Sequence, residues 1–199
     1  HDIWDIILEL RSERKTGRSA KMLFEVLGDL WVVKRNPYLQ DDLLENKKRL
    51  NMLLKAMRHR VQSIEDRSFG NMKAAQLTKA ARTAIDEFEL EFQQVKKLRK
   101  KVYSRLKKYT KKHNIQFDGL ARVSHVTDAT DWRVELPFVV VNPDTELEVA
   151  SIVKACIKLG LTIIPRGGGT GYTGGAIPLV PQSVVINTEK LDSVSQVEF

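Results

Sequence analysis

Residues 165–175 read Pro165-Arg166-Gly167-Gly168-Gly169-Thr170-Gly171-Tyr172-Thr173-Gly174-Gly175, and this glycine loop decides the fold of the second half of the chain. Six of the chain's 11 glycines lie in it. Glycine allows positive φ and leaves no Cβ between a ligand and the main-chain N–H groups. Successive N–H groups form a concave, partly positive surface that suits phosphate, and Arg166 adds a full charge. Because the apolar run 161–164 before it is typical of a buried strand, the sequence predicts a pyrophosphate-binding loop at a strand end.

Strand and helix patterns alternate on both sides of the glycine loop. Residues 138–141 and 183–187 are short and β-branched, which predicts strands. Between them, Thr145 and Glu148 have the spacing of a capping box, and Gly160 stands where the helix would end. The order is therefore strand, helix, strand, loop, strand. A helical crossover predicts that the first two strands are parallel.

Three kinds of phosphate-binding loop compete for this stretch. A Walker A loop needs Lys and Ser or Thr where residues 175–176 are Gly and Ala, so it is excluded. The dinucleotide fingerprint G-x-G-x-x-G is formally present at residues 169–174, with Glu189 where an acid would contact ribose. That fold needs a helix to begin inside the loop, and Pro178 and Pro181 leave no room for one. A loop that binds pyrophosphate by backbone N–H groups alone remains.

Residues 137–192 resemble the start of the FAD-binding domain of the p-cresol methylhydroxylase/vanillyl-alcohol oxidase type. The branch it resembles is the FAD-linked oxidases that include D-lactate and glycolate dehydrogenases. The resemblance rests on Val-Asn-Pro at 141–143, the helix start at 145–149, the loop at 166–176 and the lead-in Thr-Asp-Ala-Thr-Asp at 127–131.

The resemblance implies that the glycine loop, from Pro165 to Gly175, binds the pyrophosphate of FAD. Covalent branches carry a histidine near the third glycine, where this chain has Gly169, so non-covalent FAD is expected. In the family, the flavin oxidises a 2-hydroxy acid or a related substrate. The residues of that chemistry lie in later domains. We therefore expect a fragment of a larger multidomain FAD/FMN-linked oxidoreductase, inactive by itself, and its start at His1 and stop at Phe199 agree with this.

Residues 1–120 have helical apolar periodicity almost throughout, as at Trp4, Ile7 and Leu8. Apolar residues recur at seven-residue spacing in a helix expected to be capped by Asp41 and, after a turn at 68–70, in a very long helix to about residue 112. The apolar row of the first helix consists of Leu43, Leu50, Met57 and Ile64, and that of the second consists of Ala81, Phe88, Val95, Val102 and Tyr109. They predict an antiparallel hairpin over about 41–112 with coiled-coil packing.

The predicted fold class is α+β, in three parts. Residues 1–120 form a helical domain, 121–136 a connector, and 137–199 the truncated first lobe of an FAD-binding α/β domain. The charge distribution supports this division, because residues 1–120 hold 27 basic and 16 acidic residues while the remainder is net acidic. A further strand is expected to begin at 194–199.

The basic segment, residues 96–112, holds ten Lys and Arg, with no acid between Glu91 and Asp118. One interpretation is a solvated helix face favoured near a helix C-terminus. The other is a surface for nucleic acid, anionic lipid or another subunit, and such binding would depend steeply on salt. Under this second interpretation the chain is a non-enzymatic helical module. The sequence leaves both open, together with the oligomeric state.

The remaining residue types exclude several kinds of site. The single cysteine, Cys156, excludes a disulfide framework and an iron–sulfur or structural zinc site, and its place on an apolar helix face predicts a core residue. It also favours a cytoplasmic setting, with peripheral attachment to the inner membrane left open. His125, Asp128 and Asp131 share one loop, where such side chains more often cap the backbone, so no metal or catalytic role is assigned.

Overall fold

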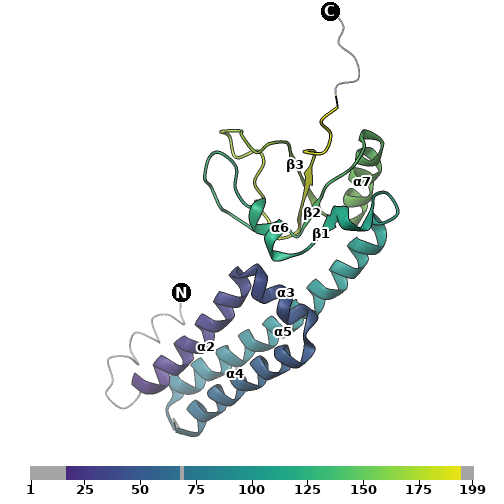
Figure 1. Ribbon diagram of the computed structural model, residues 1–199. Helices are drawn as coiled ribbons and strands as arrows, with labels where there is room; N and C mark the ends of the chain where they lie inside the picture. Colours follow the sequence, from purple (N-terminus) through teal and green to yellow (C-terminus); the bar gives the residue numbers. More distant parts are fainter. Residues whose placement is uncertain (1–16, 68–69, 194–199) are drawn as a thin grey trace, which may run out of the picture. The chain divides into compact units, whose positions relative to one another are not determined.

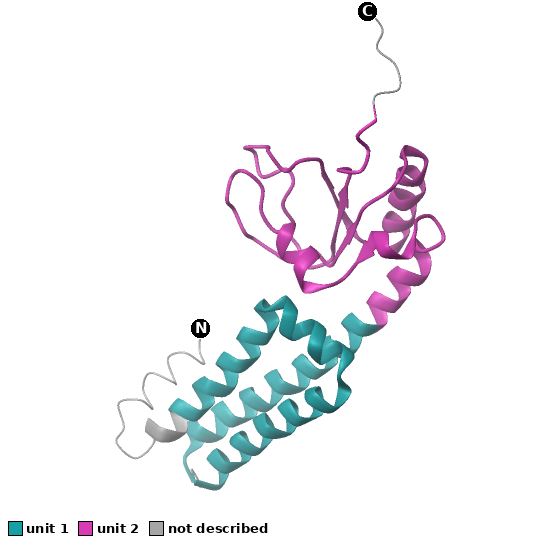
Figure 2. Ribbon diagram, in the orientation of Figure 1, with its two compact units in different colours: residues 1–96 teal, residues 97–199 magenta. Residues whose placement is uncertain are grey.

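The computed structural model describes residues 17–67 and 70–193, and the chain divides into two compact units, residues 1–96 and 97–199 (Figure 2). The division lies earlier than the boundary predicted at residue 120. Residues expected to end the helical domain instead pair and pack within the second unit. The apolar residues Trp4, Ile7 and Leu8 and the strand expected at 194–199 lie outside the described residues.

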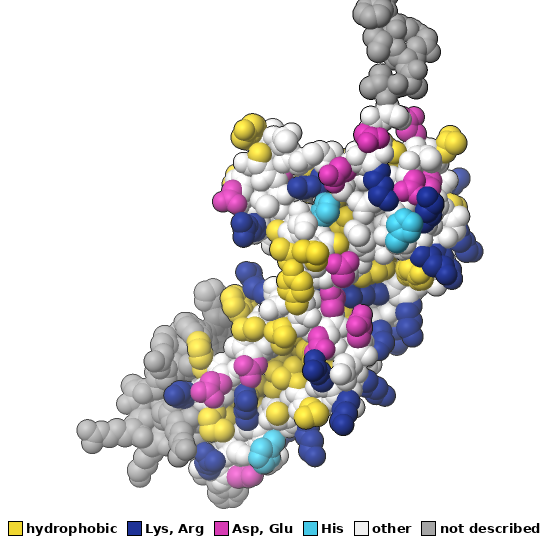
Figure 3. All heavy atoms as spheres, in the orientation of Figure 1, with side chains coloured by type: hydrophobic (Ala, Val, Ile, Leu, Met, Phe, Trp, Pro, Cys, Tyr) yellow, Lys and Arg dark blue, Asp and Glu magenta, His cyan; other side chains and the backbone are white. Residues whose placement is uncertain are grey.

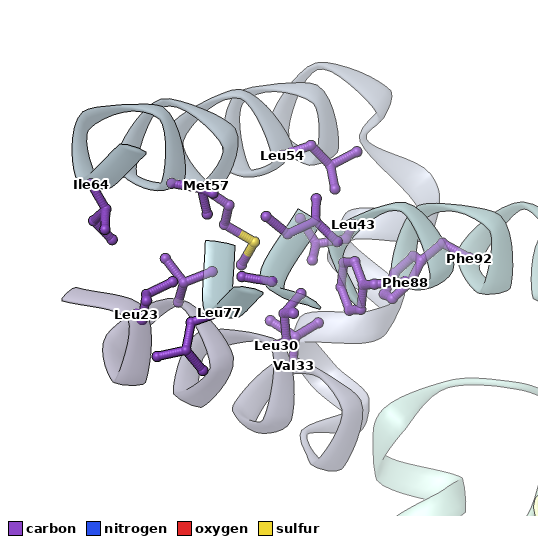
Figure 4. Packing of buried hydrophobic residues seen from close by; sticks show 14 of the residues in the cluster. Leu23, Leu30, Val33, Leu43, Leu54, Met57, Ile64, Leu77, Phe88 and Phe92 are labelled. Carbon is purple, nitrogen blue, oxygen red and sulfur yellow. The ribbon is translucent and has the colours of Figure 1, made fainter. Parts of the chain in front are cut away.

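The first unit is helical (Figure 1). Its helices are α2 (Gly17–Arg35), α3 (Pro37–Glu45), α4 (Lys47–Arg67) and α5 (Met72–Leu106), the last of which continues into the second unit. All four contribute to one apolar core (Figure 4), in which Leu30, Leu43, Met57 and Phe88 are buried together. Gly70, at φ +84°, comes just before α5. The predicted antiparallel hairpin is α4 and α5, but its core also takes in α2 and α3.

Ion pairs connect the helices of the first unit at its surface. Arg58 of α4 contacts both Asp86 and Glu89 of α5 at 2.7 Å, and Arg82 of α5 contacts Glu65 at 2.6 Å. Exposed pairs of this kind contribute little each, so the core carries most of the stability. Coiled-coil packing of the hairpin stays a prediction.

The start of the predicted hairpin was placed wrongly. The helix that contains Asp41 begins at Pro37, because the side chain of Asn36 accepts hydrogen bonds from the N–H groups of the first turn and proline suits the first helical position. It then breaks at Asn46, whose side chain accepts from the N–H of Arg49 and starts α4. The apolar period continues across this break, so periodicity did not reveal it.

In its described residues, the second unit contains a four-stranded sheet in the order β1-β2-β4-β3. Its elements are η1 (Lys112–Asn114), β1 (Ile115–Gln116), α6 (Gly119–Ser124), β2 (Val139–Val141), α7 (Glu146–Leu159), β3 (Thr162–Arg166) and β4 (Ser183–Asn187). β2 and β3 both run parallel to β4, which confirms the predicted parallel pair, although β4 lies between them. β1 pairs antiparallel with β2. The fold class is confirmed as α+β.

Local signals in the second unit were mostly predicted correctly. Gly160 ends α7 in the left-handed conformation at φ +71°, and Cys156 is fully buried. The capping box does not form, because Thr145 makes no side-chain cap and a carboxylate oxygen of Glu148 accepts at 3.0 Å from the N–H of Asp144, the residue before the cap. The predicted connector is part of the unit, since Arg122 is buried and donates to Pro137 O at 2.8 Å.

Candidate functional site: the glycine loop

The glycine loop begins at the carboxyl end of β3. Pro165 and Arg166 are the last residues of that strand, and Gly167 starts the connection to β4. β3 is at the edge of the sheet, where proline is tolerated. Within the described chain the connection contains no helix, as Pro178 and Pro181 predicted. Ligands of open parallel sheets bind at the carboxyl ends of strands, so the loop stands at the expected edge.

The main-chain N–H groups of residues 167–175 form no hydrogen bond within the described part of the protein. Gly167, Gly168, Gly171 and Gly175 are exposed, as are Thr170, Tyr172 and Thr173. A Cβ added at Gly167 or at Gly171 would meet nothing within 4 Å. The loop therefore presents a row of accessible donors with open space above the backbone, which is the arrangement that binds phosphate without a helix.

Two of the glycines have positive φ, Gly169 at +67° and Gly174 at +71°. A Cβ at Gly169 would lie 2.6 Å from Cζ of Arg166, and one at Gly174 would lie 3.3 Å from the ring of Trp132. Both positions thus need glycine for conformation and for close approach.

Arg166 is held by the protein itself. Its Nη1 donates to the carbonyl of Thr127 at 2.7 Å, and its own carbonyl accepts from the N–H of Thr188 at 2.8 Å. The guanidinium lies beside Gly169. The positive charge of Arg166 is near the loop, as the sequence suggested. The same side chain also connects the loop to residues 127–132.

Two parts of the chain match known sequence families. Residues 137–198 match the family described as FAD binding domain. This part of the chain is similar to FAD binding domains. The resemblance inferred from the glycine loop is confirmed at that level, and FAD is the cofactor it indicates. Residues 1–90 match a family described only as a protein of unknown function.

Two curated relatives match part of this chain. A D-lactate dehydrogenase of Archaeoglobus fulgidus is 43% identical over 54 residues, which are 27% of this chain and 12% of the relative. The mitochondrial D-2-hydroxyglutarate dehydrogenase of Rattus norvegicus is 36% identical over 56 residues, 28% of this chain and 10% of the relative. The chain thus spans about a tenth of the length of the curated relatives it matches.

Solved structures show a weaker similarity. An alkyldihydroxyacetonephosphate synthase aligns with 26% identity and a TM-score of 0.44, over 49% of this chain and 22% of its own. A p-cresol methylhydroxylase with bound substrate aligns with 18% identity and a TM-score of 0.44, over 51% and 20%.

The second unit has a polar cluster at the carboxyl ends of β2 and β4 that the sequence did not reveal. Asn187, the buried last residue of β4, donates to Oδ1 of Asn142 at 3.0 Å and lies 3.2 Å from Nε2 of His125. Because Nδ1 of His125 is 2.8 Å from the carbonyl of Ala121, it carries the proton and Nε2 accepts. The sequence feature that could have indicated this cluster is the asparagine at the end of each of two predicted strands, Asn142 and Asn187.

A second polar group in the second unit connects the start of α7 to the residues after β4. The Asp144 carboxylate contacts Lys111 at 2.8 Å and Lys190 at 2.9 Å, and these hydrogen bonds hold its pKa well below the usual range. Lys190 also donates to the buried Asn114 at 2.6 Å. This network is structural, because Asp144, Lys190 and Asn114 connect three parts of the fold to one another.

The other candidate groups do not form a site. Within the described residues no set of three His, Cys, Asp or Glu could hold a metal ion. Asp128 caps Thr130, while Asp131 is exposed and His125 bonds to Asn187. Desolvation raises the pKa of the Cys156 thiol to about 11, as expected of a core residue. None of the described helices combines the length and apolar character that a membrane span needs.

Proposed function

We propose that this chain is a fragment of a flavin-dependent oxidoreductase in which the glycine loop, residues 165–175, binds the pyrophosphate of non-covalent FAD. The observation that carries the proposal is the row of unpaired, accessible N–H groups from Gly167 to Gly175 at the carboxyl end of β3. Phosphate oxygens are strong acceptors, and preorganised N–H donors bind them without a dedicated side chain.

The substrate class follows from the curated relatives. Both are named as dehydrogenases of D-2-hydroxy acids, and each matches more than a quarter of this chain. Bound FAD would accept a hydride from the carbon that bears the hydroxyl group. The residues described here bind and orient the cofactor, and we assign none of them a catalytic role. Substrate-contacting residues belong to the longer protein.

Purification of the full-length protein, followed by its visible absorbance spectrum before and after added FAD, tests the proposal. A yellow protein whose flavin is bleached anaerobically by D-lactate or D-2-hydroxyglutarate is the expected result. A folded protein that stays colourless after added FAD would overturn it. The 199-residue chain alone is expected to bind FAD weakly, because the loop supplies only part of the contacts, so tight stoichiometric binding to it would contradict that part of the proposal.

The basic segment, residues 96–112, supports a second candidate, a surface for a polyanion such as nucleic acid or an anionic membrane. Figure 3 shows Lys and Arg side chains gathered along this part of the chain. Some have partners: Lys96 donates to Leu44 O, Lys111 pairs with Asp144, and Arg99 lies over the Phe117 ring. Exposed lysines that form no ion pair among the described residues are Lys97, Lys100, Lys101, Lys107, Lys108 and Lys112.

This second candidate is tested by binding to DNA and to anionic vesicles over a salt series. Association should weaken steeply with salt and should be lost on charge reversal at Lys100, Lys101, Lys107 and Lys108. Absence of binding at low salt would leave these lysines as a solvated helix face. Vesicle binding alone would favour the peripheral membrane location, and the cytoplasmic location is likewise a proposal.

A further inference from the structure

Residues 127–132, here called the support loop, contact the glycine loop near its beginning. The carbonyl of Thr127 accepts from Nη1 of Arg166 at 2.7 Å, and the N–H of Ala129 donates to the carbonyl of Gly169 at 3.1 Å. These partners are about 40 residues apart in sequence, so only the fold brings them together. Because Ala129 uses its N–H on the carbonyl of Gly169, that peptide unit is fixed in orientation.

The support loop also contacts the far end of the glycine loop. The Trp132 ring packs so close to Gly174 that a Cβ there would lie 3.3 Å from it. A segment that contacts residues 166, 169 and 174 limits how far the glycine loop can close on itself.

Asp128 organises the support loop from within. Its carboxylate is nine-tenths buried, and Oδ1 accepts from both the N–H and the hydroxyl of Thr130. Hydrogen bonds from the hydroxyl and the N–H of Thr130, and to a lesser extent the charge of Arg166, lower the pKa of Asp128. A negative charge beside a phosphate-binding loop would weaken the binding of an anion. The burial and the contacts of Asp128 therefore need another explanation than ligand binding.

We propose that Asp128 is a positioning residue that keeps the support loop folded against the glycine loop, so that the N–H groups of the latter stay open toward the cofactor. Arg166 then connects the two loops through its hydrogen bond to Thr127, and the charge of Asp128 balances that of Arg166. Recognition of the pyrophosphate falls to the backbone N–H groups. The inference rests on the proposed function for the identity of the ligand, but the contact between the loops does not depend on it.

The experiment measures two quantities on the full-length protein, the amide hydrogen exchange of Ala129 and the dissociation constant for FAD. In Asp128→Ala, exchange at Ala129 should rise at least about tenfold while the amides of β4 are unchanged, since the loss concerns one or two hydrogen bonds. The FAD dissociation constant should rise by a similar factor, about tenfold.

Asp131→Asn is the matched control for Asp128→Asn. Both acids belong to the support loop, but Asp131 is exposed, and its φ of +59° suits asparagine equally well. Asp131→Asn should leave both quantities unchanged, whereas Asp128→Asn should fall between wild type and Asp128→Ala. Thr130→Val should raise the exchange rate of Ala129 and the FAD dissociation constant as Asp128→Ala does, whereas Thr130→Ser should keep both at their wild-type values. This second pair of variants keeps the test possible where Asp128→Ala does not fold.

The outcomes separate the two proposals. Faster exchange at Ala129 in a protein that never binds FAD supports the contact between the loops and removes the proposed function. Unchanged exchange and unchanged FAD affinity in Asp128→Ala overturn the positioning role. A uniform rise in exchange across β4 and Ala129 also overturns it, since Asp128 would then only stabilise the fold.

Discussion

Gly169 and Gly160 share a left-handed backbone conformation, at φ +67° and φ +71°, but differ in what surrounds them. A Cβ at Gly160 would meet nothing within 4 Å, whereas one at Gly169 would lie 2.6 Å from Cζ of Arg166. Substitution by alanine costs about 1–2 kcal/mol in either place for the conformation alone. At Gly169 the guanidinium must also move and give up its bond to Thr127. A charged hydrogen bond is worth about 1.5–3 kcal/mol, and its partial exposure reduces this to about 1–2 kcal/mol.

Gly169→Ala should therefore cost about 1–2 kcal/mol more free energy of unfolding than Gly160→Ala. Urea denaturation followed by tryptophan fluorescence measures it, in a reference protein where Trp4 and Trp31 are phenylalanine and Trp132 reports on the second unit. In an Arg166→Ala background the excess should vanish, because the obstructing group is absent. Equal costs with Arg166 present would refute the placement of its guanidinium beside the loop.

Three further predictions concern the rest of the chain. Cys156, with a pKa raised to about 11, should not react with a thiol reagent at pH 8 until the protein unfolds, and prompt reaction in the native state would contradict its burial. The lowered pKa of Asp144 implies stability that is present above its ordinary pKa of 3.8 and lost as the pH falls below it. Asp144→Asn should thus lower Tm at pH 7. In melting curves measured over a pH series, the difference in Tm between the variant and the wild type should shrink below pH 3.8, and a difference that stays constant would contradict this role of Asp144. Phe88→Ala, at a fully buried position, should cost about 3–5 kcal/mol in urea denaturation, whereas Leu90→Ala at an exposed one should cost less than about 1 kcal/mol.

The features predicted from sequence are those with local causes. Pro178 and Pro181 exclude a helix after the glycine loop because proline lacks an N–H and restricts its own backbone. Gly160 marks the end of α7 because a left-handed residue there favours glycine. The β-branched runs at β2 and β4 predict strands because such side chains suit a pleated, buried surface. Each of these signals acts within a few residues.

The features not predicted depend on partners distant in sequence. β4 lies between β2 and β3, and no pattern within the strands specifies this neighbour. The break at Asn46 is hidden because the apolar period continues through it, while a side-chain cap decides where α4 starts. The support loop was interpreted as a polar connector, since its contacts with Arg166 and Gly169 form only in the folded unit. The candidate site was therefore predictable only in part. Its composition indicated the glycine loop, whereas the contacts that the support loop makes with it are visible only in the folded unit.

The most direct test of the central claim is FAD titration of the full-length protein carrying Gly167→Ala or Gly171→Ala. Neither Cβ would meet an atom within 4 Å, so Tm should stay unchanged. Gly28→Ala, also with nothing within 4 Å but on α2, is the matched control and should leave FAD affinity unaltered. If the pyrophosphate lies on the loop backbone, the added methyl groups should weaken FAD binding at least about tenfold, the loss of roughly one good contact. Wild-type affinity in both variants would contradict the account.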